Sequence, residues 1–202
     1  ASAFDQDLSN WGLTNKMLRD WVKRWCGGER EGLPHISTWN TSRVTDLSWL
    51  FHGKSEFNDA IGAWDTSRVT TMEKMFIGAS AFNQPLGNWR VDNVTNMQGM
   101  FYAASSFNQP LSKWRVHNVT DMGGMFRDAS SFNKPLGDWR VNKVTNMHGM
   151  FAGASAFNQP LNDWRVDNVT DMCQMFRDAK SFNHPLNDWR VDNVTNMSWM
   201  FA

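Results

Sequence analysis

The sequence contains little cysteine, no excess charge of either sign and no long apolar run, and each absence excludes a class of protein. The two cysteines, Cys26 and Cys173, stand at unrelated positions of the repeat described below, which argues against a disulfide framework or a zinc site. The formal net charge is zero at pH 7, so no basic surface for a nucleic acid is expected. The apolar runs extend over only a few residues, which is too short for a transmembrane helix.

A tryptophan returns at intervals of 25 residues through most of the chain. The same phrase surrounds it each time, as in FNQPLGNWRVDNVTNMQGMF from Phe82 to Phe101 and FNKPLGDWRVNKVTNMHGMF from Phe132 to Phe151. The repeat tryptophans are Trp39, Trp64, Trp89, Trp114, Trp139, Trp164 and Trp189. A fixed period of this size indicates one supersecondary unit that is copied in tandem and stacked on its neighbours.

Within one repeat, the sequence predicts a short strand followed by a short helix. Trp89 and Val91 alternate with polar residues, which predicts a strand over Asn88 to Asp92 with one face buried. Thr95 precedes an apolar set at helical spacing and is placed to cap the helix that follows. We therefore expect an α/β repeat solenoid of the leucine-rich-repeat type, with one short parallel strand and one short helix per 25-residue turn.

An asparagine follows the phenylalanine of each repeat, so stacking aligns these side chains in a column. Stacked asparagines can satisfy backbone groups in turns. We expect an internal asparagine ladder formed by Asn58, Asn83, Asn108, Asn133, Asn158 and Asn183.

The domain organisation is interpreted as one repeat array over residues 1–202 that is cut within a repeat at both ends, as in a fragment of a longer protein. Residues 1–11 form a partial repeat, residues 12–38 a degenerate repeat with a longer helix, and residues 39–202 the regular 25-residue repeats.

The helix predicted from Thr14 to Trp25 carries two tryptophans on one apolar stripe. Leu18, Trp21, Val22 and Trp25 have the i, i+3, i+4, i+7 spacing of a single helix face. Two tryptophans exceed what the helix of one repeat normally accommodates, which leaves two alternatives. Either both indoles thicken the core, or one is partly exposed and docks against a partner.

The repeat phrase L-x-x-W-x-V-x-N-V-T-x-M-x-x-M-F-x-x-A-x-x-F-N resembles that of BspA-like leucine-rich-repeat surface proteins, including the mycoplasma-type lipoprotein repeats. Close copies are WNTSRVTDLSWLF from Trp39 and WDTSRVTTMEKMF from Trp64. The resemblance implies a leucine-rich-repeat solenoid, an extracellular or cell-surface location, and a role in adhesion or protein binding. The chain departs from the family in using Trp and Met at core positions usually given to Leu, and residues 12–38 fit poorly.

Candidate binding residues come from the exposed positions of the predicted strands. Five successive strands carry an arginine between the buried Trp and Val, and aspartates stand two residues away. These charges form either an ion-pair lattice that only solvates the strands, or a polar face for a partner's carboxylates, glycans or backbone. The partner-binding candidates are Arg90, Arg115, Arg140, Arg165 and Arg190, with Asp138, Asp163 and Asp188, and additionally Trp21 and Trp25.

Catalytic, metal and cofactor sites are not indicated by the sequence. The five histidines occupy different positions of the repeat, and no nucleophile–base phrase or Gly-rich phosphate loop stands out from it. We therefore expect a non-enzymatic module for protein binding or adhesion, with no cofactor, a protein as partner and a glycan as the other class of ligand. The alternative is a structural subunit embedded in a larger assembly.

Overall fold

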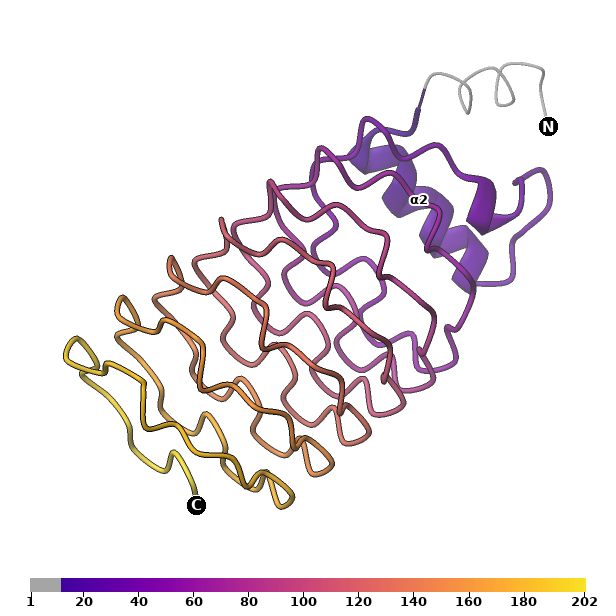
Figure 1. The fold of residues 1–202 in the computed structure, drawn as a ribbon. Coiled ribbons are helices and arrows are strands. Elements are labelled where there is room, and N and C mark those ends of the chain that lie inside the picture. The colour runs from indigo at the N-terminus through magenta and orange to yellow at the C-terminus, as the bar shows by residue number, and fades with distance from the viewer. Residues whose placement is uncertain (1–11) are drawn as a thin grey trace.

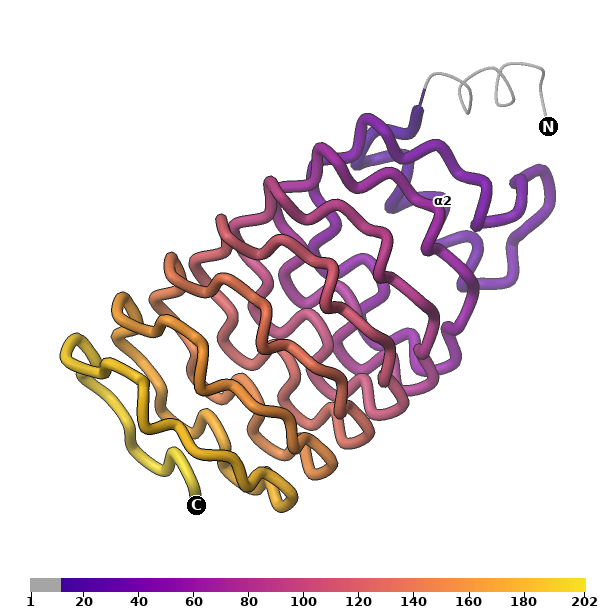
Figure 2. Tube along the Cα trace, in the orientation of Figure 1, coloured from indigo at the N-terminus to yellow at the C-terminus, as the bar shows by residue number. Residues whose placement is uncertain are grey.

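The computed structural model describes residues 12–202, and the partial repeat predicted over residues 1–11 lies outside them. The chain winds into successive coils that stack along one axis (Figure 1). The tube trace shows the coils following one another in chain order (Figure 2). Parallel bridges join residues one repeat apart, from Asp46↔Thr71 at one end to Asp171↔Asn196 at the other. Neighbours in space are therefore residues about one 25-residue repeat apart in sequence.

The predicted alternation of strand and helix is wrong. The helices within residues 12–202 are α2 (Asn15–Cys26) and the 3-10 helix η1 (Ile36–Thr38) alone, and strand pairing there is limited to isolated bridges without a sheet. Turns and irregular backbone replace the strand expected over Asn88 to Asp92 and the helix expected after Thr95. The chain is a stack of turn-rich coils, and the α/β leucine-rich-repeat solenoid is not formed.

Left-handed backbone conformations explain why no helix forms after Thr95. Gly99 has a φ of 59° and Ala103 a φ of 55°. Residues at the same two positions of other coils also have positive φ, as at Gly124 and Asp128. A left-handed residue interrupts the i→i−4 hydrogen bonds of a right-handed helix, so only single turns remain between these positions.

The backbone amides that a helix would have used bond to the next coil instead. The N–H groups of Met97, Gly99 and Phe101 donate to carbonyl oxygens of the following coil at 2.8–2.9 Å. Thr95 bonds in the other direction, because its N–H and its hydroxyl donate to the carbonyl oxygen of Thr70 at 2.9 and 3.3 Å. The threonine expected to cap a helix therefore joins two coils.

The repeat tryptophans form a column that is buried from Trp39 to Trp164 and half-buried at Trp189, which confirms their predicted inward orientation. Trp139 is 3% exposed, and its ring centroid lies 6.4 Å from that of Trp114 and 6.5 Å from that of Trp164. Its Nε1 donates to the carbonyl oxygen of Leu111 at 3.1 Å, and the same oxygen accepts the backbone N–H of Trp114 at 3.0 Å. Each indole thus ties its own coil to the preceding one. The equivalent indole bonds are made by Trp64, Trp89, Trp114, Trp164 and Trp189.

Phenylalanines and methionines fill the rest of the core. The ring of Phe126 lies 5.6 Å from Phe101 and 5.7 Å from Phe151 in the adjacent coils, and 4.1 Å from Phe132 in its own coil. Met125 next to it is fully buried. Flexible thioethers fill the gaps between flat rings, so the methionines serve as packing residues.

The asparagine ladder makes the predicted bonds at a different place. The N–H of Asn133 donates to Asn108 Oδ1 at 3.0 Å, and the N–H of Asn158 donates to Asn133 Oδ1 at 2.9 Å. These asparagines are half-buried or exposed. The ladder therefore satisfies turn amides as expected, but it runs along the surface and is not internal.

Helix α2 packs against the coil that contains Trp39. Thr14 caps it by accepting the N–H of Met17 at 3.3 Å, and the apolar stripe faces inward. The rings of Trp21 and Trp25 lie 5.2 and 5.8 Å from that of Trp39. The longer helix predicted for this segment is confirmed. Neither it nor any other helix in residues 12–202 has the length and apolar character needed to cross a membrane.

Candidate binding face

The structure places all five candidate arginines at exposed positions, one in each of five successive coils. Arg140 stands between Trp139 and Val141, which are 3% and 1% exposed. Because both neighbours point into the core, the arginine side chain points outward. The arginine column, as we call this set, consists of Arg90, Arg115, Arg140, Arg165 and Arg190.

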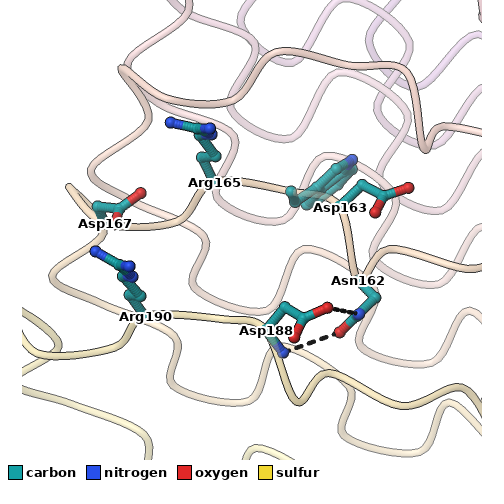
Figure 3. Close-up of a pocket in the computed structure, with 7 residues that line it drawn as sticks. Asn162, Asp163, Arg165, Asp167, Asp188 and Arg190 are labelled. Atoms are coloured by element: carbon teal, nitrogen blue, oxygen red, sulfur yellow. Dashed lines mark hydrogen bonds between the residues drawn. The ribbon is translucent and has the colours of Figure 1, made fainter.

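Recesses in the surface separate successive members of the column. One recess of about 490 Å³ lies between Arg115 and Arg140 and is also lined by Asp138. A second, of about 290 Å³, lies between Arg165 and Arg190. Figure 3 shows these two arginines on one side of the second recess and Asp163, Asp188 and Asn162 on the other. The face therefore offers cationic and anionic groups around the same hollows.

Ion pairing occupies only one end of the arginine column. Arg90 Nε lies 3.8 Å from Asp92 Oδ2, whereas the other four arginines have no carboxylate oxygen within 4.0 Å in the part of the chain that the structure describes. Asp188 instead pairs with Asn162, which donates from Nδ2 to its carboxylate and accepts its N–H at 3.1 Å. The continuous ion-pair lattice considered from the sequence does not form.

The N-terminal side of the face lacks the arginine and has Asn40 and Asp65 at that position. Asp65 occupies the position that Arg90 holds in the next coil. The hydroxyl and the N–H of Ser67 beside its carboxylate, with Arg90 contributing, hold the pKa of Asp65 below its ordinary value against the effect of partial burial. Asp65 thus stays ionised, and a negative charge stands where each of the next five coils carries a positive one.

Trp21 and Trp25 do not belong to this face. They are 8% and 4% exposed, and the core alternative holds for both. Trp25 Nε1 donates to Asp59 Oδ2 at 2.8 Å, and the Arg30 guanidinium lies 4.4 Å from the centre of its ring. Docking through either indole is therefore ruled out for this conformation, because the chain itself covers both rings.

A cluster of metal-ligating side chains lies apart from the arginine column and was missed from the sequence. His148, Asp171 and Cys173 each offer a ligand atom, and these atoms lie within 4.8 Å of one another. The five histidines occupy different repeat positions, so histidines alone give no signal. His148 and Cys173, however, occupy the same position in consecutive repeats, and this spacing of 25 residues is visible in the sequence.

The stacked coils and their repeated hydrogen bonds define a tandem-repeat protein. The chain belongs to the family described as Mycoplasma protein of unknown function, DUF285, whose model matches residues 23–137 and 109–202. No curated protein and no solved structure matches the chain. The mycoplasma-type repeat is therefore found, and no match supports the BspA-like assignment.

Proposed function

We propose that the chain is a non-enzymatic binding module whose arginine column contacts acidic and polar groups of a protein partner. The observation that carries this proposal is the lack of carboxylates within 4.0 Å of Arg115, Arg140, Arg165 and Arg190 in the described residues. A guanidinium group presents five N–H donors in a planar fork that matches a carboxylate. The stacked core fixes the spacing of the backbone positions that carry these side chains, so the arginines stand at regular intervals along the face. Ordering each exposed side chain on binding still costs about 0.5–1.5 kcal/mol.

The mixed charge of the face favours a protein over a polyanion. Asp138, Asp163 and Asp188 stand beside the arginines and repel a uniformly negative ligand. A protein surface with charges of both signs complements this arrangement. A glycan is the other ligand that the face could accept, because its hydroxyl groups bond to both aspartate and arginine. The resemblance to BspA-like surface proteins supports placing the module at the cell surface.

The test begins with capture of a partner from an extract of the source organism, followed by calorimetric titration of the purified partner or glycan. In the variant Arg115→Asn/Arg140→Asn/Arg165→Asn, each arginine receives the residue type found at the equivalent Asn40. We expect at least about 10-fold weaker binding and a smaller dependence on salt, because surface charge pairs are screened by ions.

A matched control removes three positive charges outside the arginine column. Arg127→Ala/Arg177→Ala/Lys180→Ser introduces the residue types that stand at the equivalent positions Ala152 and Ser155. The control should bind as tightly as the unmodified chain. Equal losses in both variants would show that overall charge, and not the arginine column, determines binding.

The structural-subunit alternative has one supporting observation. Trp49 and Trp199 are 43% and 69% exposed, and both are large apolar groups that an assembly would cover. Trp21 and Trp25, by contrast, are buried by the chain itself. Recovery of the chain only in a stoichiometric complex that persists in high salt would favour the subunit role over the binding module.

A further inference from the structure

We propose that His148, Asp171 and Cys173 bind a divalent transition-metal ion, with zinc as the best-matched metal. The ligands come from two adjacent coils, His148 from one and the other two from the next. One donor atom from each side chain lies within 4.8 Å of the other two. An imidazole nitrogen, a carboxylate oxygen and a thiolate sulfur form a donor set that zinc accepts.

The backbone holds the two coils together on both sides of the cluster. A parallel bridge joins Asn146 to Asp171, and the N–H of Gly149 donates to the carbonyl oxygen of Cys173 at 2.8 Å. His148 lies between these two connections and therefore stands next to Cys173. Asp171 and Cys173 are two residues apart where the bridge leads into a turn, and their ligand atoms lie within 4.8 Å of each other.

A hydrogen bond orients the Asp171 carboxylate, and the other two metal-ligating side chains remain available for an ion. Asp171 Oδ1 accepts the N–H of Cys173 at 2.9 Å, which fixes the carboxylate beside the thiol. The imidazole of His148 and the thiol of Cys173 make no hydrogen bond within residues 12–202. Hydrogen-bonded carboxylates with defined orientation are typical of metal ligands.

The separation and burial of the three side chains suit an ion with one open coordination position. All three are half-buried. Tetrahedral zinc with bonds of about 2.0–2.3 Å separates its ligand atoms by about 3.5 Å. The three ligand atoms, within 4.8 Å of one another, therefore need to approach by about 1 Å at most to bind the ion. Three protein ligands leave a fourth position for water or for a group of a partner.

The repeat does not need these residue types for folding. Gln98 and Ser198 occupy the position of His148 and Cys173 in other coils, and their N–H groups make the same bond to the residue two places before them. Asn146 likewise replaces Asp171 in the preceding coil and accepts the N–H of His148 at 2.9 Å. Histidine, aspartate and cysteine therefore coincide at one place in the stack without a structural requirement.

The experiment is a titration of the purified chain with Co²⁺ in a phosphine reductant, followed by competition with Zn²⁺. We expect one Co²⁺ per chain, a thiolate-to-cobalt charge-transfer absorption in the near ultraviolet, and its loss when zinc is added. Zinc should also raise the midpoint of thermal unfolding, because it binds the folded chain and links two coils.

Three variants use residue types that the chain itself has at the equivalent positions: His148→Gln, Asp171→Asn and Cys173→Ser. Cys173→Ser should abolish the charge-transfer band. The other two should weaken Co²⁺ binding at least about 10-fold, since loss of an outer-shell group alone costs about 10–100-fold. Each variant should keep the far-ultraviolet circular dichroism of the unmodified chain.

The controls are Cys26→Ser and His184→Gln, which change the other cysteine and a histidine outside the cluster. Both should bind Co²⁺ as the unmodified chain does. The proposal is overturned if the unmodified chain binds no Co²⁺, if Cys26→Ser removes the band, or if the three ligand variants bind with unchanged affinity. The Arg115→Asn/Arg140→Asn/Arg165→Asn variant should retain the band, so this result is independent of the proposed binding face.

Discussion

Replacement of Trp139 by alanine tests whether the tryptophan column holds the coils together. The indole is 3% exposed, stacks between two other indoles and donates a hydrogen bond to Leu111 of the preceding coil. Truncation of a buried tryptophan costs about 3–5 kcal/mol in lost burial and cavity formation. The carbonyl oxygen of Leu111 keeps the N–H of Trp114 as a partner, so no unpaired buried group adds to this cost. We therefore expect a loss of about 4–5 kcal/mol in unfolding free energy.

The assay is denaturant unfolding followed by circular dichroism, combined with hydrogen exchange of the individual coils. Stability in a repeat protein is a sum of units and their interfaces, so Trp139→Ala should lower protection most in its own coil and the two beside it. Trp189→Ala is the matched control. Trp189 is only half-buried, so its truncation should cost about 2–3 kcal/mol. Equal losses at both positions, or a loss at Trp139 below about 2 kcal/mol, would refute the role assigned to the column.

Two further predictions concern backbone conformation and pH. Ala103→Gly should raise the unfolding free energy by about 0.5–1 kcal/mol, because φ is 55° there and glycine adopts this conformation without strain. Ala104→Gly, at a fully buried position without positive φ, should instead lower it by about 1–2 kcal/mol. Thermal unfolding of both variants measures the difference. The pKa of Asp46 lies below its ordinary value. Burial of the carboxyl group raises this pKa, but hydrogen bonds from Ser48 and the guanidinium of Arg19 outweigh burial and lower it. The resulting stabilisation is present above the unfolded pKa of about 3.9 and is lost as the pH falls through the folded pKa. The unfolding free energy of Asp46→Asn should therefore decline less steeply below about pH 4 than that of the unmodified chain. The same decline in both chains would contradict this prediction.

The features that could be predicted from the sequence are those set by the burial of apolar side chains. The period of the tryptophans and their alternation with polar residues placed Trp139 in the core, where the structure has it. The apolar stripe of Leu18, Trp21, Val22 and Trp25 predicted a helix from Thr14 to Trp25, and the structure has it as α2, with Thr14 as its N-cap. Both signals act within a short stretch of chain, so neither required knowledge of how the coils stack.

The backbone path of the repeat could not be predicted from its apolar spacing alone. Met97, Met100 and Phe101 have helical spacing, yet Gly99 between them is left-handed and the amides bond to the next coil. Glycine recurs at this position in Gly124 and Gly149, and it was the signal that argued against a helix. Aligned coils compete with a helix for the same amides, and this competition is a property of the stack as a whole.

The candidate sites show the same division. The exposure of the arginine column followed from the buried neighbours of each arginine, so it could be predicted residue by residue. The absence of ion pairs along most of it depends on side-chain directions that the sequence does not specify. The cluster of His148, Asp171 and Cys173 arises from contact between two coils, and it becomes visible only when different residue types one repeat apart are compared.

The regular spacing of the bridges also governs how such a chain can change in length. Each bridge joins positions 25 residues apart, so excision or duplication of one whole unit leaves every remaining ladder aligned. A change of any other length puts tryptophans opposite polar residues. The array can therefore vary in length by single units, and each unit of the Arg90 to Arg190 part carries one arginine of the column. If the arginine column binds a partner as proposed, the number of units sets the number of linked contacts, and avidity changes without any new kind of contact.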